Sequence, residues 1–213
     1  MTTEPAYTRL AVQDRRRKLL DAGAALFAEY AFDELTMRQI AEAAGVSKAL
    51  LYHYFPSKID LFKAAVQEAA AELQRLIEPS GQGVPVRQLA DSLSAYLSWI
   101  EANARMWAKL MQSASTLAEA RELVEGFRTR TMEMILANLT GQGTPRPALR
   151  SAISGWLGYM DAAIYDWVQR QDLSREQLQD MLLAAFGAAL LAAHQVDPEI
   201  NLTVSESAVP QQT

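Results

Sequence analysis

One short segment of the chain combines several hydrogen-bond donors with no acidic side chain. Residues 47–54 read Ser-Lys-Ala-Leu-Leu-Tyr-His-Tyr and offer hydroxyl, ammonium, phenol and imidazole groups. Groups of these types donate hydrogen bonds to phosphate oxygens and to the exposed edges of bases. A surface of arbitrary composition should include some Asp or Glu, because the chain has 25 of them. The segment therefore predicts a surface that binds nucleic acid.

The residues around this segment predict two short helices that would hold it in place. Thr36 is a good N-cap for the first helix, and Gly45 supplies the positive φ that ends it. Ser47 caps the second helix, which ends at Pro56. We expect a longer helix to begin after Pro56 and to run towards Ile77.

The spacing within this unit is that of a helix-turn-helix. Ala41 is small, Gly45 follows four residues later, and the aliphatic Leu51 follows ten residues after Ala41. Two short helices that cross at about 90–120° require a small residue at the crossing point. Such a unit presents the first residues of its second helix to the major groove of DNA. The alternative is an ordinary helical hairpin with a solvated polar face.

The composition of the whole chain is that of a folded protein without cysteine. The chain has 213 residues, of which 50% are hydrophobic, and no Cys, which excludes disulfides, thiolate metal sites and cysteine nucleophiles. The first twenty residues contain no apolar run, so we expect no secretory signal. The longest apolar run, residues 181–193, is shorter than the about 20 residues of a membrane span. We therefore expect a cytoplasmic protein without a membrane segment.

The charge is distributed unevenly along the chain. The net charge of −5 taken alone argues against binding to nucleic acid. However, residues 1–63 contain nine Lys and Arg against eight Asp and Glu, whereas the remainder contains 11 against 17. The first part therefore has a net charge of +1 and the remainder −6. The two parts are expected to have different functions.

Helical periodicity fills nearly all of the chain between a few Gly- and Pro-containing breaks, so the predicted fold is all-α with about nine helices. We expect an N-terminal arm and helix-turn-helix domain over residues 1–56, and a connecting helix over residues 57–79. Residues 80–213 are expected to form a helical ligand-binding and dimerisation domain.

The stretch from Arg16 to Ala65, RRKLLDAGAALFAEYAFDELTMRQIAEAAGVSKALLYHYFPSKIDLFKAA, resembles the DNA-binding head of TetR/AcrR-family transcriptional regulators. Its segment GVSKALLYHYFPSK is highly specific to that family. The resemblance implies a three-helix head, a C-terminal all-α ligand domain, and a homodimer on a partly palindromic double-stranded DNA operator. One departure is Ala31, where family members usually have the glycine that follows the first helix. A left-handed alanine there would cost about 1 kcal/mol, unless the helix ends differently.

The resemblance also implies roles for individual residues. Four positions resemble phosphate contacts: Thr36, Arg38, Tyr52 and Lys58. Three lie where base contacts usually occur: Lys48, Ala49 and Leu50. The N-cap Ser47 and the phenol of Tyr54 complete the predicted DNA-binding set, and His53 faces either the groove or the DNA backbone.

Aromatic and methionine side chains gather between residues 95 and 165, and such side chains line adaptable apolar sites. The predicted ligand pocket consists of Tyr96, Trp99, Met106, Trp107, Leu110, Met111, Phe127, Met134, Trp156, Tyr159 and Met160. The alternative for any one of them is a place in the core. The charge of the ligand stays open, because Asp161 and Asp166 suit a cation, whereas four basic residues suit a carboxylate: Arg105, Lys109, Arg128 and Arg130.

Two helices near the C-terminus are expected to form the dimer interface. Gly155, Gly158 and Ala162 make a small-residue stripe, which favours the close approach of another helix. Residues 181–193 are apolar nearly all round and need cover on both sides, and Leu182, Phe186 and Leu190 are assigned to the interface. The alternative is a buried central helix in a monomer.

An enzyme is not expected. His53 and His194 are the only histidines, and no His, Asp and Glu cluster has the spacing of metal ligands. No cofactor and no metal site are predicted. The sequence favours a ligand-responsive regulator, most often a repressor in this family, that a small lipophilic molecule releases from DNA. The alternative is a DNA-binding protein that a protein partner controls without a small-molecule effector.

Overall fold

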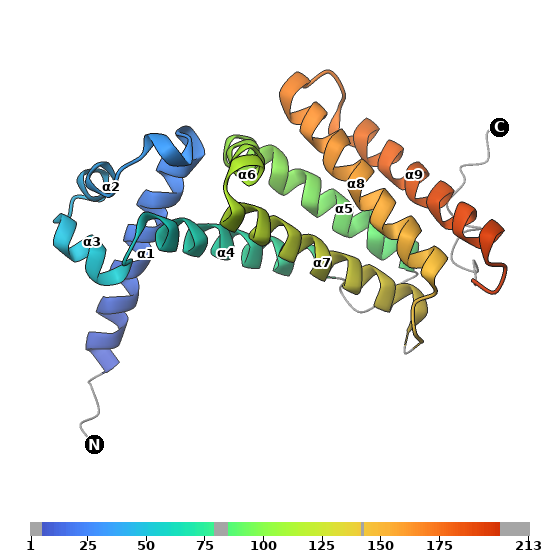
Figure 1. The fold of residues 1–213 in the computed structure, drawn as a ribbon, viewed down its shortest axis with the longest axis horizontal. Coiled ribbons are helices and arrows are strands. Elements are labelled where there is room, and N and C mark those ends of the chain that lie inside the picture. The colour runs from blue at the N-terminus through green and yellow to red at the C-terminus, as the bar shows by residue number, and fades with distance from the viewer. Residues whose placement is uncertain (1–5, 79–84, 142, 201–213) are drawn as a thin grey trace. The chain divides into compact units, whose positions relative to one another are not determined.

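The structure is a computed structural model that describes residues 6–78, 85–141 and 143–200. One of the Gly- and Pro-containing breaks between the predicted helices, residues 81–85, lies almost wholly outside them. The all-α prediction is confirmed, because the described residues form nine α-helices and a single 3-10 turn, with no strand among them (Figure 1). The elements are α1 (Ala6–Glu29), η1 (Phe32–Glu34), α2 (Met37–Ala43), α3 (Lys48–Tyr54), α4 (Lys58–Ile77), α5 (Pro85–Ala102), α6 (Ala104–Thr116), α7 (Ala118–Thr140), α8 (Pro147–Arg170) and α9 (Arg175–Val196).

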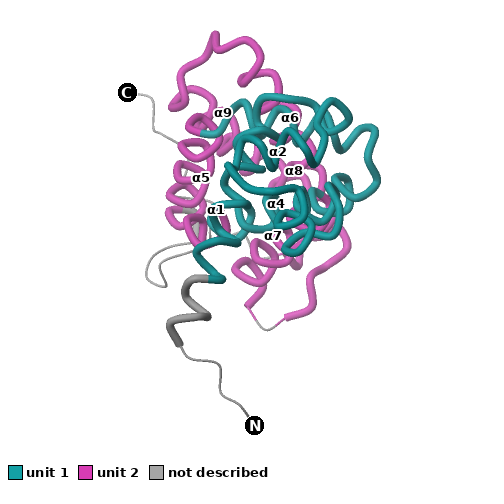
Figure 2. Tube along the Cα trace, turned by 90° about the vertical axis from the view of Figure 1, so that its left-hand side faces the viewer, with its two compact units in different colours: residues 1–72, 103–124 teal, residues 73–102, 125–213 magenta. Residues whose placement is uncertain are grey.

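The helices form two compact units whose boundaries differ from the expected ones (Figure 2). The first unit contains residues 1–72 and 103–124, and the second contains residues 73–102 and 125–213. The N-terminal helices therefore share a unit with α6 and the start of α7, which the sequence assigned to the C-terminal domain. Helices α4 and α7 each contribute residues to both units.

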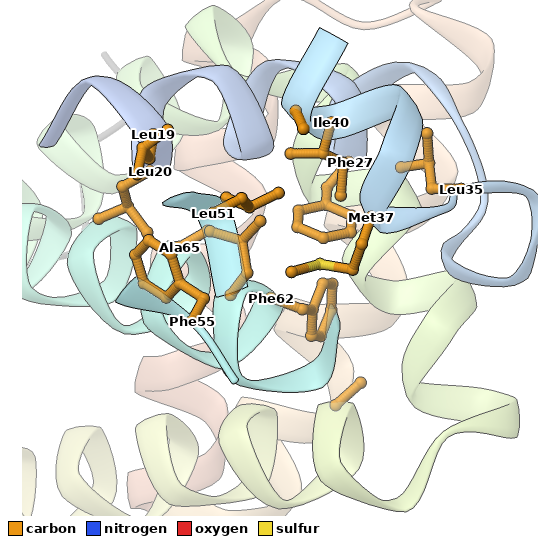
Figure 3. Packing of buried hydrophobic residues seen from close by; sticks show 13 residues of the cluster. Leu19, Leu20, Phe27, Leu35, Met37, Ile40, Leu51, Phe55, Phe62 and Ala65 are labelled. Atoms are coloured by element: carbon orange, nitrogen blue, oxygen red, sulfur yellow. The ribbon is translucent and has the colours of Figure 1, made fainter. Parts of the chain in front are cut away.

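The first unit has one hydrophobic core, to which α1, α2, α3 and α4 all contribute (Figure 3). Leu19, Ile40 and Leu51 are almost completely buried in it, and Phe62 meets Phe27 edge-on with ring centroids 5.1 Å apart. Ala120 of α7 is fully buried in the same cluster, and several apolar residues of α6 and α7 pack against it: Leu110, Ala114, Leu117 and Leu123. The residues after position 103 therefore complete the core of the head.

Helix α1 ends without a left-handed residue. Ala31 has φ −66° and ψ 151°, an extended conformation, and it precedes the 3-10 turn at Phe32–Glu34. The Glu34 carboxylate accepts a hydrogen bond from the Ala31 N–H at 2.8 Å. The chain leaves α1 through this turn, so the alanine at position 31 causes no backbone strain.

The second unit is built around α8 and α9, which pack side by side along their length (Figure 1). The Trp156 indole N–H of α8 donates to the Leu182 carbonyl of α9 at 2.9 Å, and the Phe186 ring meets the Trp156 ring edge-on. Helix α5 packs against α9, where the Gln179 amide donates to the Ala90 carbonyl at 3.1 Å. Within the described residues, no helix is both long and apolar enough to cross a membrane.

Candidate DNA-binding surface and ligand cavity

Both short helices of the helix-turn-helix begin at side-chain caps, as the sequence predicts. The Thr36 hydroxyl accepts a hydrogen bond from the Gln39 N–H at 3.3 Å, and the Gln39 side chain accepts one from the Thr36 N–H at 2.9 Å. The Ser47 hydroxyl accepts a hydrogen bond from the Leu50 N–H at 3.2 Å. These local bonds define the first residues of α2 and α3.

The turn between the two helices depends on a left-handed glycine. Gly45 has φ +66°, which confirms the prediction from the sequence. Directly after it, the Val46 N–H donates to the Ala41 carbonyl at 3.0 Å, which closes the turn. Ala41 is buried, as expected for a small residue where the helices cross.

The predicted reading residues of α3 lie on its exposed side. Ser47, Lys48, Ala49 and His53 are exposed, and the Tyr52 side chain is 41% exposed. The Lys48 ammonium lies 5.6 Å from the centre of the Tyr52 ring, one turn further along the helix. This cation–π contact holds the lysine against the helix surface with its donors accessible.

The opposite side of α3 anchors the helix. Leu51 is completely buried, while Leu50 and Tyr54 are half-buried, and Tyr54 packs against the head core. The His53 ring meets the Tyr54 ring edge-on at 5.3 Å between centroids. The Tyr54 ring thus supports the helix, and less of it is available for DNA than of Tyr52.

On α2, Arg38 lies two positions after the cap residue Thr36, and both residues are exposed to solvent. The Arg38 guanidinium is 3.7 Å from the Glu42 carboxylate, one turn along the same helix. A solvent-exposed pair of this length is weak, so it leaves Arg38 available to a phosphate.

Lys58 makes contacts within the protein that were not predicted from the sequence. Its ammonium donates to the Phe32 carbonyl at 2.6 Å and to the Leu35 carbonyl at 2.8 Å, and it lies 4.2 Å from the centre of the Phe32 ring. The side chain is half-buried. These bonds give Lys58 a positioning role, because they join the first turn of α4 to the loop that precedes Thr36, and its phosphate contact stays a prediction.

The second unit contains an apolar cavity with an empty volume of about 750 Å³, which includes space open to solvent. None of its lining residues carries a charge. Eleven of them are aliphatic, aromatic or sulfur-containing: Ile77, Leu89, Leu93, Tyr96, Phe127, Met134, Ile135, Leu139, Trp156, Met160 and Phe186. Four are polar: Gln88, Ser92, Thr131 and Asn138. This lining suits a largely apolar ligand.

Five of the predicted pocket residues line this cavity, namely Tyr96, Phe127, Met134, Trp156 and Met160. The other six lie elsewhere. Met106, Trp107, Leu110 and Met111 belong to α6 in the first unit, where Leu110 packs against the head core. Tyr159 is 40% exposed on α8, and the half-buried Trp99 is not part of the lining. The α6 residues were predicted to line the pocket because α6, like the cavity helices, contains aromatic and methionine side chains.

The charged residues considered for a ligand are paired with one another or lie away from the cavity. Arg128 and Asp161 form an ion pair at 3.0 Å between α7 and α8. Burial raises the pKa of the Asp161 carboxyl above its usual value, and the Arg128 charge acts in the opposite direction. Asp166 instead accepts a hydrogen bond from Arg170 at 2.7 Å. The basic residues Arg105, Lys109 and Arg130 are likewise absent from the lining.

Gly158 has a different neighbour from the one expected. A Cβ atom at this position would lie 3.2 Å from the Arg128 guanidinium, which reaches across α8 towards Asp161. Gly158 therefore makes room for a side chain of the same chain. Around Gly155, by contrast, a Cβ atom would meet nothing within 4 Å.

Three residues that were assigned to the dimer interface face the interior instead. Leu182, Phe186 and Leu190 are 0%, 5% and 3% exposed, and Phe186 also lines the cavity. Their assignment is corrected: these large side chains of α9 form the core of the unit. The sequence could not distinguish the two faces of α9, because both are apolar.

Helices α8 and α9 also have an apolar face on the side away from these buried residues, and this face is exposed to solvent. We call it the outer face of α8 and α9, and it consists of Gly155, Tyr159, Ala162 and Tyr165 of α8 with Met181, Ala184, Ala188 and Leu191 of α9. All eight residues are exposed, with Tyr165 at 47% and Leu191 at 52%. Their spacing of three and four residues produces one continuous stripe along each helix.

Several cavity residues were missed from the sequence. Ile77, Leu89 and Leu93 lie outside the aromatic and methionine cluster that motivated the prediction, and so do the polar Ser92 and Thr131. Aliphatic residues at helical spacing look the same whether they line a cavity or fill a core. The small hydroxyl residues give no signal at all without the fold.

These features define a class of protein: a helix-turn-helix DNA-binding protein with a second helical unit that contains an apolar cavity. Residues 19–65 match the family described as "Bacterial regulatory proteins, tetR family", and residues 85–189 match "Tetracyclin repressor-like, C-terminal domain". The chain belongs to the tetR family of bacterial transcriptional regulators.

Individual proteins that are similar to this chain are also named as transcriptional regulators. The chain is 32% identical to the HTH-type transcriptional regulator HbdR of Aromatoleum sp. (strain CIB) over 144 residues, 64% of this chain and 62% of that protein. It is 37% identical to the HTH-type transcriptional repressor KstR of Rhodococcus jostii (strain RHA1) over 90 residues, 42% of this chain and 41% of that protein. The matched regions thus span less than two thirds of both relatives.

The fold also matches that of solved structures. A tetR-family transcriptional regulator from Streptomyces coelicolor superimposes with a TM-score of 0.82 at 25% identity, over 94% of this chain and 91% of that chain. A TetR-like transcriptional regulator from Rhodococcus sp. RHA1 covers 83% of this chain and 96% of its own, with a TM-score of 0.68 at 25% identity. Both units of the fold are therefore those of the family.

Proposed function

We propose that the protein is a cytoplasmic repressor that binds a partly palindromic operator as a homodimer and leaves it when a small lipophilic molecule occupies the cavity. Relatives named as transcriptional repressors, such as KstR of Rhodococcus jostii, support the direction of control. The exposed donors of α3 support DNA as the partner, with Lys48 at the base edges and Arg38 and Tyr52 at phosphates.

The observation that supports ligand control is that a single helix contributes to both the cavity and the head. Ile77 at the end of α4 lines the cavity, and its carbonyl accepts a hydrogen bond from the cavity residue Ser92 at 2.7 Å. At the other end of α4, Lys58 is bonded to the carbonyls of Phe32 and Leu35 in the head. A ligand that displaces Ile77 acts on a helix whose first turn is tied to the head.

The outer face of α8 and α9 supports the homodimer. Four of the ten exposed large hydrophobic residues among the described residues belong to this face: Tyr159, Tyr165, Met181 and Leu191. Exposed apolar surface that is concentrated in this way marks an interaction site, and a symmetric copy of the same face would complete a four-helix bundle.

In the operator-bound state, the two α3 helices of the dimer would lie about 34–36 Å apart, one turn of DNA. Ligand binding shifts the population towards dimers with another spacing. An effector that reverses occupancy from 99:1 to 1:99 must bind the free form about 10⁴-fold more tightly than the DNA-bound form.

A protein partner without a small-molecule effector is the second candidate. It would require an exposed apolar face without an enclosed cavity. The cavity of the second unit favours the small molecule, because its lining is largely apolar with a few polar groups, as in ligand sites.

The DNA-binding part can be tested with an operator selected from random duplex DNA by the full-length protein. Lys48→Ala should weaken binding to the selected operator about 5- to 100-fold for each half-site, the effect of losing one good base contact there. Tyr52→Phe should weaken it about 2- to 10-fold for each half-site, because it removes one phosphate hydrogen bond there. Lys63→Ala, which removes the same charge from the side of α4, is the matched control and should bind as the unchanged protein does.

Ligand control is tested by screening lipophilic compounds for release of this operator. Filling the cavity by Met160→Trp should abolish the response to an active compound while DNA binding persists. A compound that binds the second unit and leaves operator affinity unchanged would contradict ligand control. Wild-type affinity of both Lys48→Ala and Tyr52→Phe would contradict the role of α3.

A further inference from the structure

The polar groups in the cavity differ in what they can offer a ligand. The Ser92 hydroxyl donates its proton to the Ile77 carbonyl at 2.7 Å, and the Thr131 hydroxyl donates its proton to the Phe127 carbonyl at 3.0 Å. A hydroxyl has one proton and two lone pairs. Both oxygens therefore present lone pairs to the cavity and act there as acceptors.

The indole N–H of Trp156, the one tryptophan in the lining, is already hydrogen-bonded within the protein. Trp156 donates its indole proton to the Leu182 carbonyl at 2.9 Å, so it has none left for a ligand. A carboxylate among these side chains would meet acceptors, and it would lose the water that stabilises its charge. The surroundings of Ser92, Thr131 and Trp156 thus disfavour an anion.

A cation is disfavoured for a different reason. No Asp or Glu is among the lining residues, and the carboxylate of Asp161, which neighbours Met160 in sequence, is paired with Arg128 at 3.0 Å. An ammonium group could donate to Ser92 or Thr131, but its charge would be buried without a counter-ion. A neutral donor gains the same hydrogen bond without that cost.

At the mouth of the cavity, the polar side chains are amides instead of hydroxyls. Asn138 is exposed and Gln88 is half-buried, and both amides belong to the lining. A polar group that stays beside Asn138 remains in contact with water. The Ser92 and Thr131 oxygens are therefore acceptors for groups that enter further.

From this arrangement we propose that the cavity binds uncharged lipophilic alcohols or phenols, with the ligand hydroxyl donating to the Ser92 or Thr131 oxygen. This inference rests on the proposed function, in which the cavity is the effector site. It names the chemical class that the effector must have.

Three probes with the same ten-carbon chain test the class: 1-decanol, decanoate and decylammonium. Their dissociation constants for the full-length protein are measured by titration calorimetry and by tryptophan fluorescence. We expect 1-decanol to bind at least about tenfold more tightly than either ion, since a buried charge without a partner costs more than a neutral hydrogen bond returns.

Two variants locate the hydrogen bond. Thr131→Val keeps the shape of the side chain and Ser92→Ala shortens it, and each should weaken 1-decanol binding about 2- to 10-fold if its oxygen is the acceptor. Thr140→Val is the matched control, because Thr140 donates to the Leu136 carbonyl on the same helix at 2.9 Å and does not line the cavity. At least one of the two variants must show the loss, and the control must not.

The inference is wrong if 1-decanol does not bind, if decanoate or decylammonium binds as tightly, or if neither variant affects the alcohol. A decanoate that binds more tightly would instead indicate a carboxylate held at the mouth by the amides, and the cavity would still be an effector site. If 1-decanol binds as expected but does not release the selected operator, the ligand class stands and the proposed ligand control fails. Thermal melts of each variant confirm that it is folded.

Discussion

The Lys58 ammonium donates to the Leu35 carbonyl at 2.8 Å, across 23 positions of the chain. The same ammonium donates to the Phe32 carbonyl and lies over the Phe32 ring. The two carbonyls belong to the segment between α1 and α2, in which the 3-10 turn η1 is the one regular element. One side chain therefore fixes the position of this segment, and with it the start of α2, relative to α4.

Lys58→Met should destabilise the head. A hydrogen bond to a charged group contributes about 1.5–3 kcal/mol, so we expect the free energy of unfolding to fall by about 2 kcal/mol. Urea denaturation followed by circular dichroism measures it, with Lys63→Met as the control that removes a charge from the same helix. A Lys58→Met protein that is as stable as the unchanged one but binds the operator poorly would show that Lys58 acts as a DNA contact and not through positioning.

Gly45→Ala should lower stability by about 1 kcal/mol, because alanine is strained at the left-handed φ of +66°. A Cβ atom there would meet nothing within 4 Å, so the cost comes from the backbone alone. Gly45→Asn, which tolerates this conformation better, should lose less. Equal losses in the two variants would show that the turn had changed its conformation.

Arg38→Ala and Lys48→Ala should differ in their dependence on salt. A phosphate contact adds about 0.9 to the slope of log affinity against log salt concentration, so Arg38→Ala should reduce the slope by roughly 2 for a dimer. Lys48→Ala should instead relax the preference for one base pair in each half-site. Operator titrations at several salt concentrations, repeated with operators altered at single base pairs, separate the two effects.

Ala188→Glu should convert the proposed dimer to monomers. The residue lies in the middle of the outer face of α8 and α9, where two copies would bury like charges against apolar side chains. Sedimentation velocity measures the change in mass. Ala137→Glu, on the exposed side of α7, is the matched control and should leave the mass unchanged. Identical masses for the two variants would place the interface elsewhere.

Asp161→Asn should alter how stability depends on pH. Because burial raises the pKa of Asp161 in the folded state, the carboxyl stabilises the fold when protonated, and this contribution is lost as the pH rises through the folded pKa. The difference in unfolding free energy, variant minus unchanged protein, should therefore increase between the ordinary Asp pKa of 3.8 and neutral pH. A difference that decreases over this range would show that the Arg128 pair outweighs burial.

The local parts of the site could be predicted from the sequence because their causes are local. The caps at Thr36 and Ser47 and the left-handed Gly45 each depend on residues within four positions, and all three are confirmed. The contact of Lys58 with Leu35 depends on how α4 packs, so spacing along the chain could not indicate it.

The second unit was predicted less completely for a related reason. Helix α9 is apolar on both faces, and packing alone decides that Leu182 and Leu190 are buried while Ala188 and Leu191 are exposed. The composition of α6 resembles that of the cavity helices, yet Leu110 packs on the head core. Composition predicts that a residue is buried without identifying the neighbours that bury it.

Because Ala120 and Leu117 belong to the head core, truncations and chimeras of this protein need to retain them. A fragment that stops before position 80 would leave the apolar surface that these residues and Leu110 cover open to water. A chimera that fuses only the N-terminal helices to a foreign sensor domain would expose the same apolar surface at its junction. The DNA reader of this protein is a discontinuous module, and a graft that keeps it intact must include residues 103–124.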